Sequence, residues 1–185
     1  ELGGSDPFIV LEDAEINEAV KTAVTARLIN NGQSCIAAKR FIVVEKVYNE
    51  FEKKFVDAMS KVKIGDPMNK ETELGPIARE DLLLELDDQI QKSVAKGAKI
   101  LCGGKRNDSF YEPTILANAN NKMKACSEEI FGPVVTLEKF YSFEDAVKMI
   151  NDTSFGLQAG VFTDKISEMD YAHNNIETGG IIIND

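Results

Sequence analysis

The stretch Asn30-Asn31-Gly32-Gln33-Ser34-Cys35 joins a predicted helix to a predicted buried strand and ends on a thiol. Before it, apolar residues recur at helical spacing and Asp13 is a good N-cap residue, so we predict a helix over residues 13–28. After it, residues 41–44 read Phe-Ile-Val-Val, which predicts a strand covered on both faces. The cysteine therefore lies in a loop between two core elements, and such loops commonly carry functional residues.

The remainder of the chain repeats this alternation of strands and helices. An apolar run after Pro7 predicts a strand over residues 8–11, and apolar stripes predict helices over residues 48–62 and 82–94. Further strands are predicted at residues 99–102, 134–137, 159–162 and 179–183, further helices at residues 143–151 and 166–176, and extended chain at residues 110–121. We therefore predict an α/β fold, an open and mostly parallel sheet with helices on both faces in three α/β/α layers.

The composition excludes several classes of function. The 185 residues carry a formal net charge of -10, which argues against nucleic-acid phosphates or an anionic membrane as a partner. No apolar run reaches the roughly 20 residues of a transmembrane helix, and no signal peptide opens the chain, so we expect a cytoplasmic protein. Three cysteines without a Cys-x-x-Cys pair and a single histidine supply no ligand set for zinc, so no metal site is predicted.

Two further motifs accompany the thiol. The chain opens with Glu1-Leu2-Gly3-Gly4, a carboxylate followed by two residues whose missing Cβ permits close backbone approach. Residues 128–133 read Glu-Glu-Ile-Phe-Gly-Pro. Together with Gly32-Gln33-Ser34-Cys35, about thirty residues after the first motif, they resemble the active-site signatures of the aldehyde dehydrogenase superfamily. The resemblance extends over essentially the whole chain.

The resemblance implies roles for five residues. Cys35 would attack the aldehyde carbonyl, and Glu1 would be the general base that activates the water hydrolysing the thioester. The backbone N–H of Cys35, with an asparagine outside this chain, would bind the oxyanion. Glu129 would accept hydrogen bonds from both hydroxyls of the nicotinamide ribose, with Phe131 packed beside it. Leu2 matches a position whose backbone meets the nicotinamide carboxamide.

The resemblance also implies NAD or NADP as the cofactor and a small aldehyde as the substrate. Glu1 favours water over coenzyme A as the final acceptor, so the product would be a carboxylic acid. Residues 156–163 and the Ile-Ile-Ile-Asn-Asp ending are most similar to branches that act on small hydroxyaldehydes, such as lactaldehyde or glyceraldehyde derivatives.

The chain has the features expected of a domain fragment. No glycine-rich turn followed by a helix and a later acidic residue occurs, so we expect the dinucleotide-binding domain to lie outside residues 1–185, which would form the thiol-bearing catalytic domain. The chain also opens directly on a motif and stops within a predicted core strand. We expect the fragment alone to be inactive and the full-length enzyme to be a homo-oligomer.

Two other interpretations stay open. The chain is alternatively a non-catalytic assembly module derived from the same fold, in which Cys35 carries out no chemistry. A thiol hydrolase is a third option, but it requires a histidine partner for the thiol. The only histidine, His173, lies on a predicted helix without a partner at a recognisable spacing.

The other polar and thiol side chains near the motifs have structural interpretations. Cys102 lies in a predicted strand and is expected to be buried and inert. Cys126 is expected to be partly exposed, beside acidic residues that disfavour its thiolate. We interpret Lys39-Arg40 as a solvated pair ahead of a strand, and Asn30-Asn31 as turn formers that support the cysteine loop.

Overall fold

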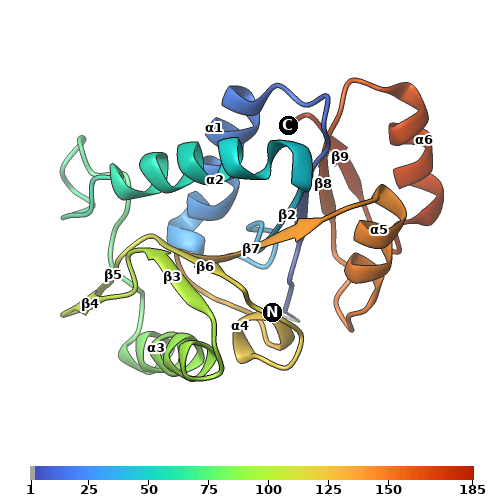
Figure 1. The fold of residues 1–185 in the computed structure, drawn as a ribbon. Helices are drawn as coiled ribbons and strands as arrows, with labels where there is room; N and C mark the ends of the chain where they lie inside the picture. The colour runs from blue at the N-terminus through green and yellow to red at the C-terminus, as the bar shows by residue number, and fades with distance from the viewer. Residues whose placement is uncertain (1–2) are drawn as a thin grey trace.

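The computed structural model describes residues 3–185 and shows one seven-stranded sheet with helices on both faces (Figure 1). The strands of the sheet are β1 (Pro7–Val10), β2 (Arg40–Val44), β3 (Lys99–Cys102), β6 (Thr114–Ala117), β7 (Val134–Phe140), β8 (Ala159–Phe162) and β9 (Ile181–Ile183). Their order is β3-β6-β7-β2-β1-β8-β9, and every neighbouring pair is parallel except β3 with β6. The predicted α/β class and mostly parallel sheet are confirmed.

Helices cover both faces of this sheet, and a small ribbon lies apart from it. The helices are α1 (Ile16–Leu28), α2 (Glu45–Ser60), α3 (Glu80–Ala95), α4 (Lys124–Ser127), α5 (Phe143–Asn151) and α6 (Ile166–Asn175), with a 3-10 turn η1 (Ile29–Gly32) after α1. The ribbon consists of β4 (Arg106–Asn107) and β5 (Phe110–Tyr111). None of the helices in residues 3–185 has the length and apolar character needed to cross a membrane.

Alternating side chains of the strands divide the core into layers. Phe8 belongs to the apolar cluster that contains α1 and α2, whereas its neighbour Ile9 belongs to the cluster of α5 and α6 on the opposite face. A third cluster places α3 and α4 against Leu116 of β6. Figure 1 shows α1 and α2 on one side of the sheet and α3 and α4 on the other. The predicted three layers are therefore present.

The predicted elements are found with shifts of their ends. The strand at residues 99–102, the helix at residues 143–151 and the strand at residues 159–162 have the predicted bounds. By contrast, α2 begins at Glu45, three residues earlier than predicted, and β7 continues to Phe140. The first helix begins at Ile16, because Glu15 is its N-cap and accepts two backbone N–H groups of the first turn.

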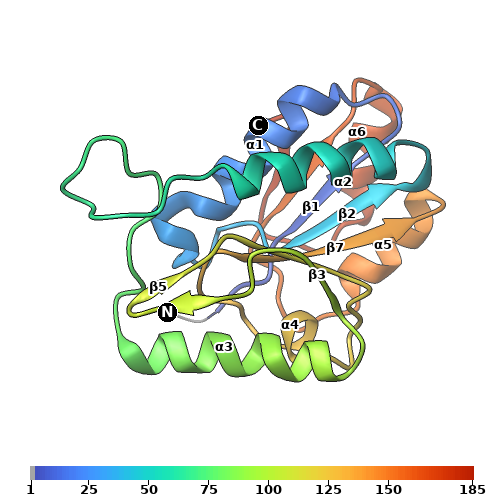
Figure 2. The same ribbon diagram turned by 60° about the vertical axis from the view of Figure 1, so that its left-hand side comes forward.

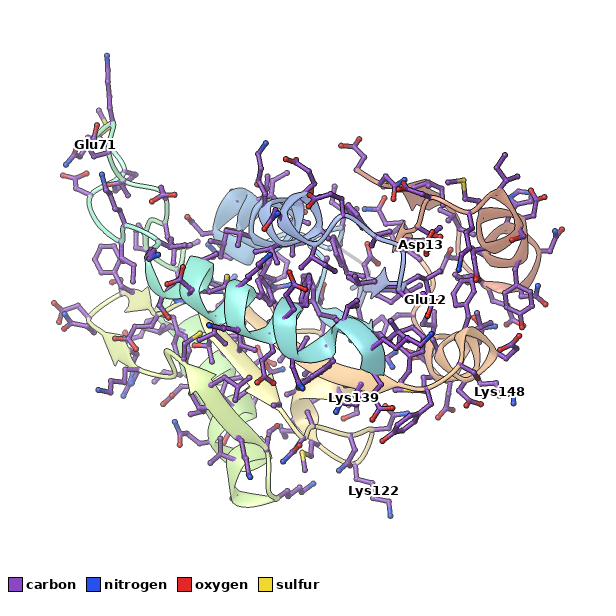
Figure 3. The ribbon with its side chains drawn as sticks, turned by 45° about the horizontal axis from the view of Figure 1, so that its top comes forward. Glu12, Asp13, Glu71, Lys122, Lys139 and Lys148 are labelled. Carbon is purple, nitrogen blue, oxygen red and sulfur yellow. The ribbon has the colours of Figure 1, made fainter. Side chains whose placement is uncertain are left out.

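Asp13, the predicted N-cap, has a different role. Its carboxylate accepts the Thr163 hydroxyl at 3.0 Å and the Asp164 N–H at 2.8 Å, so it ties the loop after β1 to the end of β8. The adjacent Glu12 pairs with Lys46 and Lys165. Figure 3 shows Glu12 and Asp13 next to each other in this loop. The prediction of the N-cap was wrong because this tertiary contact competes with local capping.

The loop between α2 and α3 projects from the body of the molecule (Figure 2). An isolated parallel bridge between Ile64 and Leu74 closes it, and Lys63 pairs with Glu71 at 2.8 Å. Figure 3 places Glu71 far out on this loop. At the base of the loop, the Gly75 N–H donates to Oδ1 of Asn31 in the cysteine segment at 2.8 Å.

A chain of phenylalanine rings connects the sheet to α2. The Phe41 and Phe55 ring centroids are 5.0 Å apart, and those of Phe51 and Phe55 are 5.3 Å apart. Phe55 is fully buried. Because aromatic pairs add to the free energy gained by apolar burial, Phe55 contributes strongly to the attachment of α2 to the sheet.

We predict that Phe55→Ala lowers the free energy of unfolding by about 3–5 kcal/mol, because it leaves a cavity beneath α2. The control is Tyr141→Ala, since the Tyr141 side chain is 72% exposed; its effect should stay within about 0.5 kcal/mol. Denaturant unfolding of both variants measures the difference. Similar losses for the two variants would contradict the packing described here.

Candidate active site

The three motifs meet at one edge of the sheet. Gly3 and Gly4 precede β1, Cys35 precedes β2 and Glu129 precedes β7. Because β7, β2 and β1 are parallel neighbours, the segments that precede them lie at the same edge, formed by the amino ends of the strands. The segment before β8, on the other side of β1, contributes Gln158 to the same edge.

Direct contacts connect the motifs. The Gly4 N–H donates to Oε1 of Glu129 at 2.9 Å. A Cβ on Gly4 would lie 2.2 Å from the Cys35 carbonyl oxygen, so only glycine permits this approach. The three motifs therefore lie together, as far as the described residues reach. Glu1 and Leu2 lie outside these residues, and the chemical roles of Cys35 and Glu129 stay predictions.

A fully buried arginine holds two of the motifs together. Arg27 lies on α1 with no exposed surface. Its guanidinium donates to backbone carbonyls of Gly32, Ala37, Ala38, Ile130 and Gly132. Burial lowers its pKa to about 9, opposed by the negative charge of Glu129, so it is protonated at neutral pH. Sequence reasoning missed Arg27, although it follows Ala23 by four residues and so continues the apolar stripe of the helix.

The asparagines before the cysteine shape its loop, as predicted. Asn30 and Asn31 have φ values of 49° and 59°, in the left-handed region that asparagine tolerates best after glycine. Asn30 Nδ2 donates to the Gln33 carbonyl at 2.8 Å, and Asn31 Oδ1 accepts the Gly75 N–H at 2.8 Å. Gln33 Oε1 accepts the Ala78 N–H at 2.9 Å. The cysteine loop is thus attached to the base of the projecting loop.

The interpretation of Lys39 and Arg40 as a solvated pair was wrong, because both side chains are only 2% exposed. Lys39 Nζ donates to three backbone carbonyls of the cysteine loop. Arg40 donates to the Met149 carbonyl at 3.0 Å, and its Nε lies 4.0 Å from Glu138. Because both residues are charged, the sequence suggested that their side chains are solvated. In the structure, backbone and carboxylate oxygens inside the protein are their partners instead.

Asp6 is a second titratable group at this edge that sequence reasoning missed. It is 3% exposed and accepts the Gln158 N–H at 3.4 Å, while its Oδ2 has no hydrogen-bond partner among the described residues. Burial raises its pKa to about 6, although the nearby positive charge of Lys39 opposes this rise. A carboxylate, an ammonium and the cysteine loop therefore lie together.

The other two cysteines are less suited to chemistry than Cys35, because burial raises the pKa of each. Cys126, predicted to be partly exposed, is buried, and burial raises its pKa to about 12. Cys102, expected to be buried, is partly exposed like Cys35, but the burial of its thiol still raises its pKa. His173 is exposed on α6. Within residues 3–185, no group of three or more His, Cys, Asp or Glu side chains is placed to hold a metal ion.

Two hollows differ in their relation to the motifs. One, of about 330 Å³, is lined by Glu129 and Phe131 and by Leu86 of α3. A larger one, of about 840 Å³, lies between α2 and the segment after β6 and contains none of the motif residues. Lys122 and Lys139, labelled in Figure 3, line the larger hollow. The site is therefore identified by its residues, not by the size of a cavity.

We predict that Gly4→Ala alters the reactivity of Cys35 and lowers the free energy of unfolding by about 1–3 kcal/mol, because backbone must move to admit the methyl group. The matched control is Gly160→Ala, whose Cβ would meet Phe8 at an ordinary 3.6 Å. Iodoacetamide labelling of Cys35 and denaturant unfolding measure both effects. Equal effects of the two substitutions would show that Gly4 is not constrained by Cys35.

Comparison with known proteins identifies the family of the chain. The model of the aldehyde dehydrogenase family matches residues 1–185. The chain is 46% identical to the NADP(+) succinate-semialdehyde dehydrogenase of Mycobacterium avium and 46% identical to the NAD(P)+ succinate semialdehyde dehydrogenase Sad of Escherichia coli. Each alignment covers 100% of this chain and 40% of the relative.

Solved structures give the same result. Aldehyde dehydrogenase 21 from Physcomitrella patens, in complex with the reaction product succinate, has a TM-score of 0.97 and 40% identity over 100% of this chain and 39% of its own. Lactaldehyde dehydrogenase from Escherichia coli has a TM-score of 0.95 and 33% identity over the same shares. The chain thus spans about two fifths of the length of the relatives it matches. With the motifs, their contacts and the sheet in agreement, the chain belongs to the aldehyde dehydrogenase family.

Proposed function

We propose that residues 1–185 are the thiol-bearing catalytic domain of a longer, homo-oligomeric enzyme that oxidises an aldehyde to a carboxylic acid with NAD or NADP. The observation that carries this proposal is the position of Cys35. It is the partly exposed thiol at the sheet edge where Gly4 and Glu129 meet. The dinucleotide-binding domain is then supplied by sequence that the relatives have beyond the two fifths matched here.

The proposed reaction uses the thiol twice. The Cys35 thiolate attacks the carbonyl carbon, and the oxygen of the resulting thiohemiacetal carries negative charge. A bound nicotinamide would supply the acceptor for the hydride lost from this carbon, which would leave a thioester on Cys35. Water, activated by a base for which Glu1 is the candidate, then releases the acid and the free thiol. The balance is aldehyde, oxidised cofactor and water giving carboxylic acid, reduced cofactor and a proton.

The residues near Glu129 fit a nicotinamide ribose. The Gly4 N–H holds one carboxylate oxygen of Glu129 in a fixed orientation. A carboxylate retains further acceptor capacity, which suits a vicinal diol. The hollow that Glu129 shares with Phe131 has an apolar wall at Leu86. These observations support Glu129 and Phe131 as the cofactor-binding residues of this chain.

For the substrate, we favour succinate semialdehyde. Relatives at 44–46% identity are succinate-semialdehyde dehydrogenases, and a structure at 40% identity contains succinate. Lactaldehyde is the second candidate, because residues 156–163 resemble that branch and lactaldehyde dehydrogenase structures match at 33–34% identity. Steady-state kinetics of the complete polypeptide, with both aldehydes and both cofactors, discriminates between them.

We predict that Cys35→Ser in the complete polypeptide lowers aldehyde oxidation by roughly a thousandfold or more, because serine is a far weaker nucleophile at neutral pH. Cys102→Ser is the matched control and should retain activity. Formation of reduced cofactor, followed by absorbance, measures both. Activity of Cys35→Ser comparable with the control would rule out the thiol mechanism.

Thiol labelling separates the enzyme from the alternative of an assembly module. In the enzyme, iodoacetamide should modify Cys35 at neutral pH much faster than Cys102 or Cys126, whose pKa values are raised by burial. Mass spectrometry of the time course identifies the modified residue. Equally slow modification of all three thiols would favour a module without chemistry.

A further inference from the structure

The backbone carbonyls of residues 34–38 all have hydrogen-bond donors from buried or partly buried side chains. Lys39 Nζ donates to the carbonyls of Ser34 at 3.2 Å, Cys35 at 3.1 Å and Ala37 at 2.9 Å. Gln158 Nε2 donates to the Ile36 carbonyl at 3.3 Å, and Arg27 donates to those of Ala37 and Ala38 at 3.2 Å. Lys39 thus binds more carbonyls of this loop than either other side chain.

This arrangement fixes the orientation of the Cys35 backbone N–H. The Ser34 carbonyl and the Cys35 N–H belong to one planar trans peptide group, in which C=O and N–H point in opposite directions. Because the Ser34 carbonyl faces the Lys39 ammonium, the Cys35 N–H faces away from it. Within residues 3–185, this N–H has no hydrogen-bond acceptor. The described residues therefore leave this N–H free to donate to a bound group.

We propose that Lys39 is a positioning residue, which orients the Cys35 peptide so that its N–H stabilises the oxyanion formed when the thiol attacks an aldehyde. This inference rests on the proposed function. Lys39 acts only through the loop and does not contact the substrate. Three N–H bonds of an ammonium match three carbonyls, so the protonated side chain satisfies each of them.

The charges around Lys39 make this device sensitive to pH. Burial and, to a smaller extent, the positive charge of Arg27 lower the pKa of Lys39 to about 8. The charges of Asp6, Glu129 and Cys35 act in the opposite direction. A neutral amine has only two N–H donors and no charge, so above about pH 8 one of the three carbonyls loses its Lys39 donor and the loop is held less firmly.

The decisive variant is Lys39→Met in the complete polypeptide, which keeps most of the side-chain length but removes the charge and the donors. We expect kcat for the best aldehyde to fall about 100-fold with KM changed less than about threefold, as for loss of transition-state stabilisation. Lys21→Met, at an exposed position of α1, is the matched control and should have wild-type kinetics.

The pH profile separates positioning from a merely structural role. The ratio of wild-type kcat to Lys39→Met kcat should be largest near neutral pH and decrease above about pH 8, where wild-type Lys39 loses its proton. A ratio that is constant across this range, or a wild-type kcat for Lys39→Met, would overturn the inference. In either case, loss of activity in the Cys35→Ser variant would still support the proposed function.

A second variant keeps the test decisive when Lys39→Met does not fold, as judged by thermal unfolding. Lys39→Arg keeps a positive charge well above pH 8. We expect it to retain measurable activity at neutral pH and to lack the decrease in kcat that wild type shows above about pH 8. The same decrease in Lys39→Arg and wild type would assign that decrease to another group and overturn the inference.

Discussion

The guanidinium of Arg27 is buried in the core, and its hydrogen-bond partners within residues 3–185 are all backbone carbonyls. These carbonyls belong to two loops, the cysteine loop and the loop of Glu129. A buried charge costs several kcal/mol unless hydrogen bonds compensate it, and each unsatisfied buried carbonyl costs about 1–3 kcal/mol. The two loops therefore stabilise each other through the Arg27 side chain. They also approach each other closely at Gly32 and Gly132, since a Cβ on Gly32 would lie 2.3 Å from the Gly132 carbonyl oxygen.

The electrostatics of this edge differ from those of the protein as a whole. The chain carries a net charge of -10, but two buried cations, Arg27 and Lys39, lie beneath the cysteine loop. Burial shifts the pKa of Lys39 downward and that of Asp6 upward, so desolvation outweighs their mutual attraction. In the proposed reaction, the thiolate and the oxyanion are both negative. Positive charge near the loop favours the negative oxyanion.

Periodicity in the sequence was sufficient to predict most of the strands and helices, because their apolar faces are long and regular. The motif residues were found for a different reason, since their spacing resembles a known family. Arg27 and Asp6 were missed by both kinds of reasoning, and Lys39 was wrongly interpreted as solvated. Arg27 and Lys39 bind backbone oxygens, and Asp6 contacts Gln158 in a loop distant in sequence. Residue type alone does not indicate such partners. The N-cap at Glu15 was missed because Asp13 is drawn to Thr163.

The type of fold alone would have predicted the site at the wrong edge of the sheet. In open α/β sheets, ligands usually bind outside the carboxyl ends of the strands, where crossovers of adjacent strands go to opposite faces. Here β2 leads to α2 on one face and its neighbour β7 leads to α5 on the other, and the larger hollow, lined by Tyr48, Lys139 and Met149, opens near that point.

The motifs nevertheless gather at the amino ends. The loops before β1, β2, β7 and β8 converge there, and buried and partly buried side chains, not a helix N-terminus, orient their backbone groups. A single buried cation that binds several carbonyls fixes the orientation of the peptide groups in a loop. The N–H groups on the other side of those peptides then point away from the cation and can act as hydrogen-bond donors. The residues at an edge, not the topology of the sheet, therefore determine where such a protein can do chemistry.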